Sequence, residues 1–242
     1  MMPASPDGFF ATTRWTMVRA AGESASPAAA DALESLCAAY WFPLYAYVRR
    51  HGFSNEDAED LTQTFFAKLL ERHDFAGLKQ ENGRFRAFLL AALKNFLANE
   101  RDRAGRLKRG GHITHLSLDW QSADTRFQIA DGGLIPPDAA YDREWAVSLL
   151  DRVLVRLGEE ESAAEGKAER FERMKLFLTM GKGEIPYASA AAALAMDEGA
   201  VRVAVHRLRK RYRELLRNEV AETLSDPAMV DEELAVLLGA FR

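Results

Sequence analysis

Cysteine is almost absent from this chain, whose 242 residues include only Cys37. A single thiol cannot form an intramolecular disulfide, which excludes the disulfide-stapled class of small secreted domains and fits a reducing compartment. Cys37 lies in a helix-like stretch beside apolar neighbours. We therefore expect a buried structural thiol rather than a nucleophile.

Long apolar runs are also lacking. The apolar stretches are interrupted by charge and fall far below the ~20 residues that a membrane-spanning helix needs. The opening sequence MMPASPDGFFATTRW has neither a basic start nor an apolar run of signal-peptide length. We expect a cytoplasmic protein with no membrane partner.

Signatures of catalysis and metal binding are weak. His112 and His115 are three residues apart, but no second ligand pair follows at zinc spacing. The sequence GKGE at residues 181–184 lacks the phosphate-binding loop pattern. No nucleophile can be matched with a base and an orienting acid. We expect no metal, no other cofactor and no enzymatic activity.

The charge is unevenly distributed. A net charge of −4 argues, as an average, against a nucleic-acid partner. Two segments, 84–109 and 202–217, are nevertheless strongly basic, whereas 56–60 and 159–161 are acidic. Because a DNA phosphate responds to the local field, both basic segments are candidates for nucleic-acid binding.

Helical periodicity runs through nearly the whole chain, and the absence of clear strand alternation predicts an all-α fold. Residues 110–137 are the exception, with little periodicity and three Gly-Gly or Pro-Pro pairs. A connector of this length is unusual inside a compact domain. We expect two small helical domains, 27–109 and 138–222, joined by a flexible linker at 110–137. An N-terminal extension with a short helix (1–26) precedes them, and an amphipathic C-terminal tail (223–242) follows.

Three helices are expected in the first domain. One covers about 27–51 and contains Pro43, which should kink it. The next begins at Ser54, whose hydroxyl can cap free amides, and Asp57 would complete a capping box. The third follows Gly83 and leaves through the basic sequence NERDRAGRLKRGG, which either frays or meets DNA.

Residues 187–217, YASAAAALAMDEGAVRVAVHRLRKRYRELLR, have the pattern of a helix-turn-helix. A short helix ends in a tight turn at Ala195 and Met196, and Asp197 is a natural N-cap for the next helix. One face of the short helix carries Tyr187, Ala191 and Leu194. The inward seam of the second helix comprises apolar residues at steps of four and three: Val201, Val205, Leu208, Tyr212 and Leu215.

The opposite face of that second helix is basic. We expect its DNA-binding residues to be Arg202, Val203, His206, Arg207, Arg209 and Lys210. A helix-turn-helix places the start of its second helix in the major groove, where arginine can pair with guanine and later cations neutralise phosphates. A basic helix by itself is as often a solvated surface, and the preceding helix, turn and cap favour DNA binding.

This segment resembles the promoter-recognition domain of extracytoplasmic-function sigma factors of the sigma-70 family, whose helix-turn-helix ends in a pattern like AVRVAVHRLRKRYRELL. DAEDLTQTFFAKLL at 57–70 resembles the family's helix that docks on the clamp of the largest polymerase subunit. FRAFLLAALKNFLANERDRAGRLKR at 85–109 resembles its promoter-melting and minus-10 segment, and FATTRW at 10–15 is similar to the start of a subgroup. The resemblance covers about residues 10–110 and 140–240, in the family's order.

The resemblance implies a sigma factor that directs core RNA polymerase to promoters, with sigma regions 2 and 4 in the two domains. It assigns binding of core polymerase to Asp57, Asp60, Leu61, Gln63 and Phe66. It assigns the minus-10 element, including its unpaired strand, to Lys94, Asn95, Asn99, Arg101, Arg103 and Arg106. It assigns the minus-35 element to the basic face of the second helix described above.

Three departures from the family pattern stand out. Ala195 occupies a turn position where the family often has glycine, and alanine is strained there if the turn needs a positive φ. Asn99 stands where many members have aspartate. The loop around 159–167 is longer than usual. Promoter preference could differ accordingly.

The roles of the connecting segments stay open. The family implies that the linker threads toward the polymerase active-site cleft, where Asp119, Asp124 and Asp131 could mimic nucleic acid or be simply solvated. For the C-terminal tail we favour packing on the second domain over docking a regulator such as an anti-sigma partner.

Two other functions are compatible with the sequence. A stand-alone helix-turn-helix repressor or adaptor would bind a palindrome as a dimer, but the acidic, apolar helix at 57–70 is hard to explain on that reading. The second alternative is a protein that binds polymerase but never initiates transcription.

Overall fold

The computed structural model describes residues 27–72, 84–104, 120, 122–130, 135–162, 167–180 and 184–241. Over these ranges the chain forms nine α-helices and one short 3-10 helix, with no strand beyond an isolated bridge between Arg84 and Leu224. The expected all-α class is confirmed. The expected short helix in 1–26, the histidines at 112 and 115, and most of the 110–137 linker lie outside the described residues.

The chain divides into two compact units. Unit 1 comprises residues 1–145 together with 221–242, and unit 2 comprises 146–220. The division falls inside a helix, α6 (Pro137–Ser162), rather than in the connector where we had expected it. The last residues of the chain group with unit 1.

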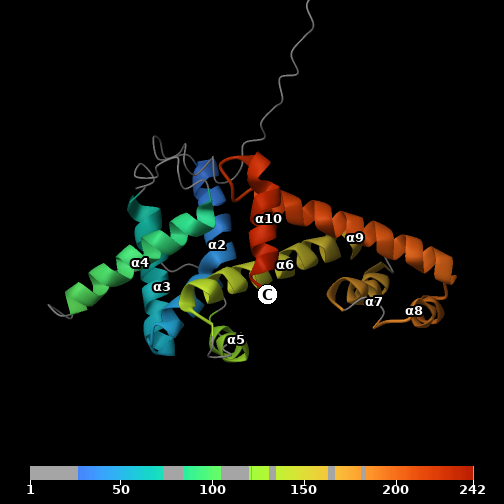
Figure 1. Cartoon of the computed structure of the whole chain (residues 1–242), viewed down its shortest axis with the longest axis horizontal. Coiled ribbons are helices and arrows are strands. Elements are labelled where there is room, and N and C mark those ends of the chain that lie inside the picture. Colours follow the sequence, from blue (N-terminus) through green and yellow to red (C-terminus); the bar gives the residue numbers. More distant parts are fainter. Residues whose placement is uncertain are drawn as a thin grey trace, which may run out of the picture. The chain divides into compact units, whose positions relative to one another are not determined.

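Helix α2 (Pro27–Arg50) forms the centre of unit 1, against which α3 (Asn55–Arg72) and α4 (Phe85–Ala104) pack (Figure 1). Residues 42–48 are buried without interruption, so this helix is enclosed on all sides rather than amphipathic. The helix also continues through Pro43. Burial around the proline offsets the lost backbone hydrogen bond, which costs about 3 kcal/mol in an exposed helix.

The predicted cap at Ser54 is confirmed. The Asp57 amide donates to Ser54 Oγ at 3.1 Å, and the Ser54 hydroxyl donates to Asp57 Oδ2 at 2.8 Å. The second bond differs from that of a full capping box, in which a longer Glu or Gln side chain reaches back to the N-cap amide.

Part of the expected flexible linker is an ordered helix. Helix α5 (Ala123–Ala130) packs on α2, with the Phe127 ring 6.3 Å from Tyr45 and Asp124 Oδ1 2.8 Å from the Arg49 guanidinium. Asp124 is therefore paired rather than available as a nucleic-acid mimic. Asp119 and Asp131 lie outside the described residues.

The expected packing of the C-terminal tail on the second domain is wrong. Helix α10 (Val230–Gly239), which follows a 3-10 turn at Pro227–Met229, packs on unit 1. Glu233 is only 1% exposed and accepts a hydrogen bond from Arg86 Nε of α4 at 3.0 Å. The Arg86 guanidinium also binds Asp142, and the Phe85 amide donates to the Thr223 carbonyl at 3.0 Å. A buried ion pair thus holds the tail in place, and apolar periodicity cannot reveal such a pair.

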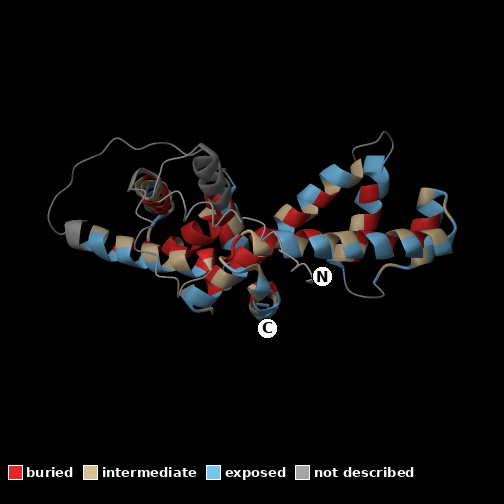
Figure 2. Cartoon of the chain, turned by 90° about the horizontal axis from the view of Figure 1, so that it is seen from above, coloured by how far each residue is buried: buried red, intermediate tan, exposed pale blue. Residues whose placement is uncertain are grey.

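Unit 2 contains the rest of α6 and the helices α7 (Lys167–Thr179), α8 (Tyr187–Leu194) and α9 (Glu198–Ala221). Its core has two clusters. One joins α6, α7 and the middle of α9 through Val153, Leu157, Phe171, Met174, Leu208 and Leu215. The other joins α7, α8 and the start of α9 through Phe177, Ala190, Ala191, Val201 and Val205. Along the helices, buried and exposed residues alternate (Figure 2).

The turn after α8 uses a left-handed alanine. Ala195 has φ 50° and ψ 42°, and the Met196 amide donates to the Ala191 carbonyl at 3.0 Å, as in a Schellman motif. An L-residue with a side chain is destabilised in this conformation by about 1–2 kcal/mol, and glycine is not.

We expect Ala195→Gly to raise the free energy of unfolding by about 1 kcal/mol, since it removes that strain. Urea denaturation followed by circular dichroism measures the change. Ala192→Gly, at an exposed position within α8, is the matched control and should destabilise the protein by up to about 1 kcal/mol. Equal destabilisation by both substitutions would contradict this account of the turn.

Candidate nucleic-acid interface

Helices α8 and α9 meet at a corner of three residues, 195–197. The predicted N-cap is confirmed, because Asp197 Oδ1 accepts a hydrogen bond from the Ala200 amide at 2.9 Å. Gly199 suits this cap, since a Cβ there would lie 3.0 Å from the same carboxylate oxygen. The cap fixes the residue at which α9 begins.

The predicted inward seam of α9 is confirmed. Val201, Val205, Leu208 and Leu215 are at most 2% exposed. Tyr212 is half-buried and donates a hydrogen bond to the Leu150 carbonyl of α6 at 3.2 Å, and burial raises the pKa of its hydroxyl to about 12. Packing of this seam leaves the opposite face of α9 in solvent.

That outer face brings together five of the six predicted minus-35 residues. Exposed side chains there are Arg202, Val203, His206, Arg207 and Lys210. Val203 is a large apolar residue with 52% of its surface exposed among cations. Arg209 differs, since it is half-buried and donates from Nη2 to the Phe177 carbonyl of α7 at 3.0 Å. Its side chain turns back toward α7, so Arg209 is the least suited of the six predicted residues to contact DNA.

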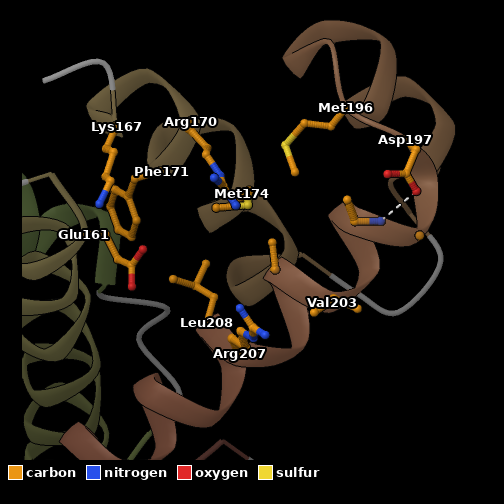
Figure 3. A pocket seen from close by; sticks show the side chains of 13 residues that line it. Glu161, Lys167, Arg170, Phe171, Met174, Met196, Asp197, Val203, Arg207 and Leu208 are labelled. Carbon is orange, nitrogen blue, oxygen red and sulfur yellow. Dashed lines mark hydrogen bonds between the residues drawn. The ribbon is translucent and has the colours of Figure 1, made fainter. Parts of the chain in front are cut away.

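A groove of about 620 Å³ lies beside this face, between α7 and the first half of α9. Phe171, Met174 and Leu208 line it with apolar surface, and Figure 3 shows Lys167 and Arg170 on α7 across from Val203 and Arg207 on α9. Sequence reasoning missed Lys167 and Arg170. In the sequence they are only two cations three residues apart in the first turn of a helix. That pattern is too common to indicate a binding site.

The predicted minus-10 residues lie along α4. Lys94, Asn95, Asn99 and Arg101 are exposed, whereas Phe85, Leu89, Leu93 and Leu97 form the buried stripe of the same helix. The Lys94 ammonium is 2.6 Å from Asp138 Oδ2, and the Arg101 guanidinium lies 5.5 Å from the centre of the Phe53 ring. Nothing is described of the Arg103 side chain, and Arg106 lies outside the described residues.

The predicted polymerase-binding residues separate into three groups on α3. Asp57 and Asp60 are exposed in its acidic first turns, and Leu61 and Gln63 are half-buried. Phe66 is 0% exposed. Its side chain is therefore part of the unit 1 core and is not available to a partner in this structure.

Comparison with protein-family models, with curated proteins and with solved structures finds no match to this chain. Within the described ranges, no helix is both long and apolar enough to cross a membrane. The same ranges hold no group of three or more His, Cys, Asp or Glu side chains that could bind a metal ion.

Proposed function

We propose that this protein is a sigma factor of the extracytoplasmic-function type, which binds core RNA polymerase and directs promoter-specific transcription initiation. The observation that carries the proposal is the outer face of α9. There, a capped helix with a packed inner seam presents Arg202, Val203, His206 and Arg207 to solvent beside a groove with further cations.

This face has the chemistry that duplex DNA requires. Arginine side chains at the start of α9 can pair with guanine O6 and N7 in the major groove, and the Val203 side chain can contact a thymine methyl group. Lys167 and Arg170 on the far side of the groove would neutralise phosphates and so set the register of the helix on the duplex. The minus-35 element is the DNA that this face would read.

Helix α4 would read the minus-10 element. Asn95, Asn99 and Arg101 offer exposed hydrogen-bond donors and positive charge, which suit the bases and phosphates of an unpaired strand. Lys94 is paired with Asp138 in the free protein, and both side chains are largely exposed. Such surface pairs contribute less than about 1 kcal/mol, so a DNA phosphate can displace Asp138.

Polymerase would dock on α3. Asp57 and Asp60 place two exposed carboxylates in its first turns, and the half-buried Leu61 and Gln63 continue the surface. A stand-alone repressor does not need a surface that binds polymerase. Polymerase binding therefore separates the proposed function from the repressor.

We expect the purified protein to co-elute with core RNA polymerase in size-exclusion chromatography, and Asp60→Arg to weaken that complex by about tenfold or more. Reversing a charge at a complementary interface introduces like-charge repulsion of several kcal/mol. Asp151→Arg, on an exposed position of α6 in unit 2, is the matched control and should leave binding unchanged. Tight binding to DNA alone with no polymerase complex would overturn the proposal in favour of the repressor.

A further inference from the structure

Arg202 is held by two neighbours on the outer face of α9. Its guanidinium carbon lies 4.4 Å from the centre of the Tyr187 ring, which belongs to the first residue of α8. Its Nε donates to Glu198 Oε1, one turn earlier on α9, at 3.0 Å, and Nη2 donates to the same oxygen. An exposed arginine on a helix normally samples several rotamers, and these contacts restrict it.

The ring that supports Arg202 is itself fixed. Tyr187 stacks on Phe177 of α7, with ring centres 4.9 Å apart and planes 15° from parallel. Phe177 is 6% exposed and belongs to the core cluster of α7, α8 and α9. A continuous set of contacts therefore runs from the core of unit 2 through Tyr187 to the Arg202 guanidinium. The sequence suggested only that Tyr187 shares one face of the short helix with Ala191 and Leu194.

The hydrogen bonds to Glu198 leave several N–H donors of the Arg202 guanidinium able to bind a base. A guanidinium has five N–H donors, and the Nε and one Nη2 hydrogen serve Glu198. The remaining donors include both hydrogens of Nη1. One Nη1 hydrogen and the second Nη2 hydrogen point the same way along the outer edge of the guanidinium, and they can make the two parallel hydrogen bonds that arginine forms with guanine O6 and N7.

We propose that Tyr187, together with Glu198, is a positioning residue that fixes Arg202 for reading one guanine in the promoter duplex. This inference rests on the proposed function and deepens it. Immobilising a long side chain on binding weakens the complex, and a side chain ordered beforehand avoids most of that cost. Tyr187 therefore sharpens base preference at the single position that Arg202 reads, without touching DNA itself.

The test is selection of promoter duplexes from a randomised upstream region by holoenzyme reconstituted with each full-length variant. Arg202→Ala should lose the guanine preference at one position. Tyr187→Leu, which keeps an apolar contact for Phe177, should weaken preference at that same position and lower affinity for the selected duplex by about threefold to tenfold. Tyr187→Phe should retain both, since the ring remains. Adding Tyr187→Leu to Arg202→Ala should cost nothing further.

Other outcomes overturn the inference in distinct ways. An unchanged guanine preference in Tyr187→Leu, or tighter binding, would show that the ring does not position Arg202 for reading. An equal loss on all sequences would assign Tyr187 a merely structural role. Should Tyr187→Leu fail to fold in thermal melting, Glu198→Gln tests the same restraint from an exposed position. If wild-type holoenzyme selects no sequence at all, the proposed function itself fails.

Discussion

Replacing Arg202 and Arg207 together with alanine is expected to lower promoter binding by the holoenzyme by about 100-fold. Each well-placed arginine–guanine pair contributes about 1–3 kcal/mol of discrimination, and every 1.4 kcal/mol is a factor of ten. Both side chains are exposed on the outer face of α9, so their removal leaves the packed seam intact. Competition between specific and scrambled duplexes measures the loss.

The matched control is Arg213→Ala. Arg213 is exposed on the same helix six residues after Arg207 and donates to the Arg209 carbonyl at 3.2 Å. It should affect specific and scrambled duplexes about equally, through charge alone. If the Arg202 and Arg207 substitutions also weaken both duplexes equally, α9 supplies only phosphate contacts and does not read sequence.

Glu233→Ala is expected to lower the free energy of unfolding by about 3 kcal/mol. Removing one partner of a buried ion pair leaves the other charge buried without compensation, which costs roughly 3–5 kcal/mol. Arg86 is 8% exposed and would retain Asp142 as its remaining carboxylate partner, which places the loss at the lower end. Burial lowers the pKa of Arg86, but its interactions with Glu233 and Asp142 together outweigh this effect and leave the pKa raised. Because a guanidinium is not deprotonated in proteins, Arg86 remains a buried cation when Glu233 is removed.

Denaturation in urea, followed by circular dichroism, measures this effect. The control is Glu232→Ala, one residue earlier, whose side chain is 64% exposed although it pairs with Arg84. An exposed pair of this kind is worth less than about 1 kcal/mol. Similar small losses for both glutamates would mean that α10 is not held by the buried pair.

Features that depend on neighbours in sequence were predictable. The caps at Ser54 and Asp197 join residues three positions apart, and the seam of α9 follows from helical spacing. The left-handed turn at Ala195 was foreseen only as a condition, because an alanine in that position carries no signal that φ is positive.

Features that depend on partners far away in the sequence could not be predicted. Glu233 pairs with Arg86 across 147 positions, and each looks like an ordinary surface charge in its own helix. Helix α5 is only eight residues long, and it is held by contacts with Tyr45 and Arg49 of α2. Phe66 sits on the apolar face of an acidic helix, and spacing alone does not say whether such a face packs inward or against a partner. The contact of Tyr187 with Arg202 joins two helices whose relative placement only the fold supplies.

Run-off transcription with purified core RNA polymerase on promoter fragments tests the central claim most directly. We expect transcripts that start at defined sites only when this protein is added. A protein that binds the polymerase but yields no specific transcript would be one that never initiates, and that result would contradict the account.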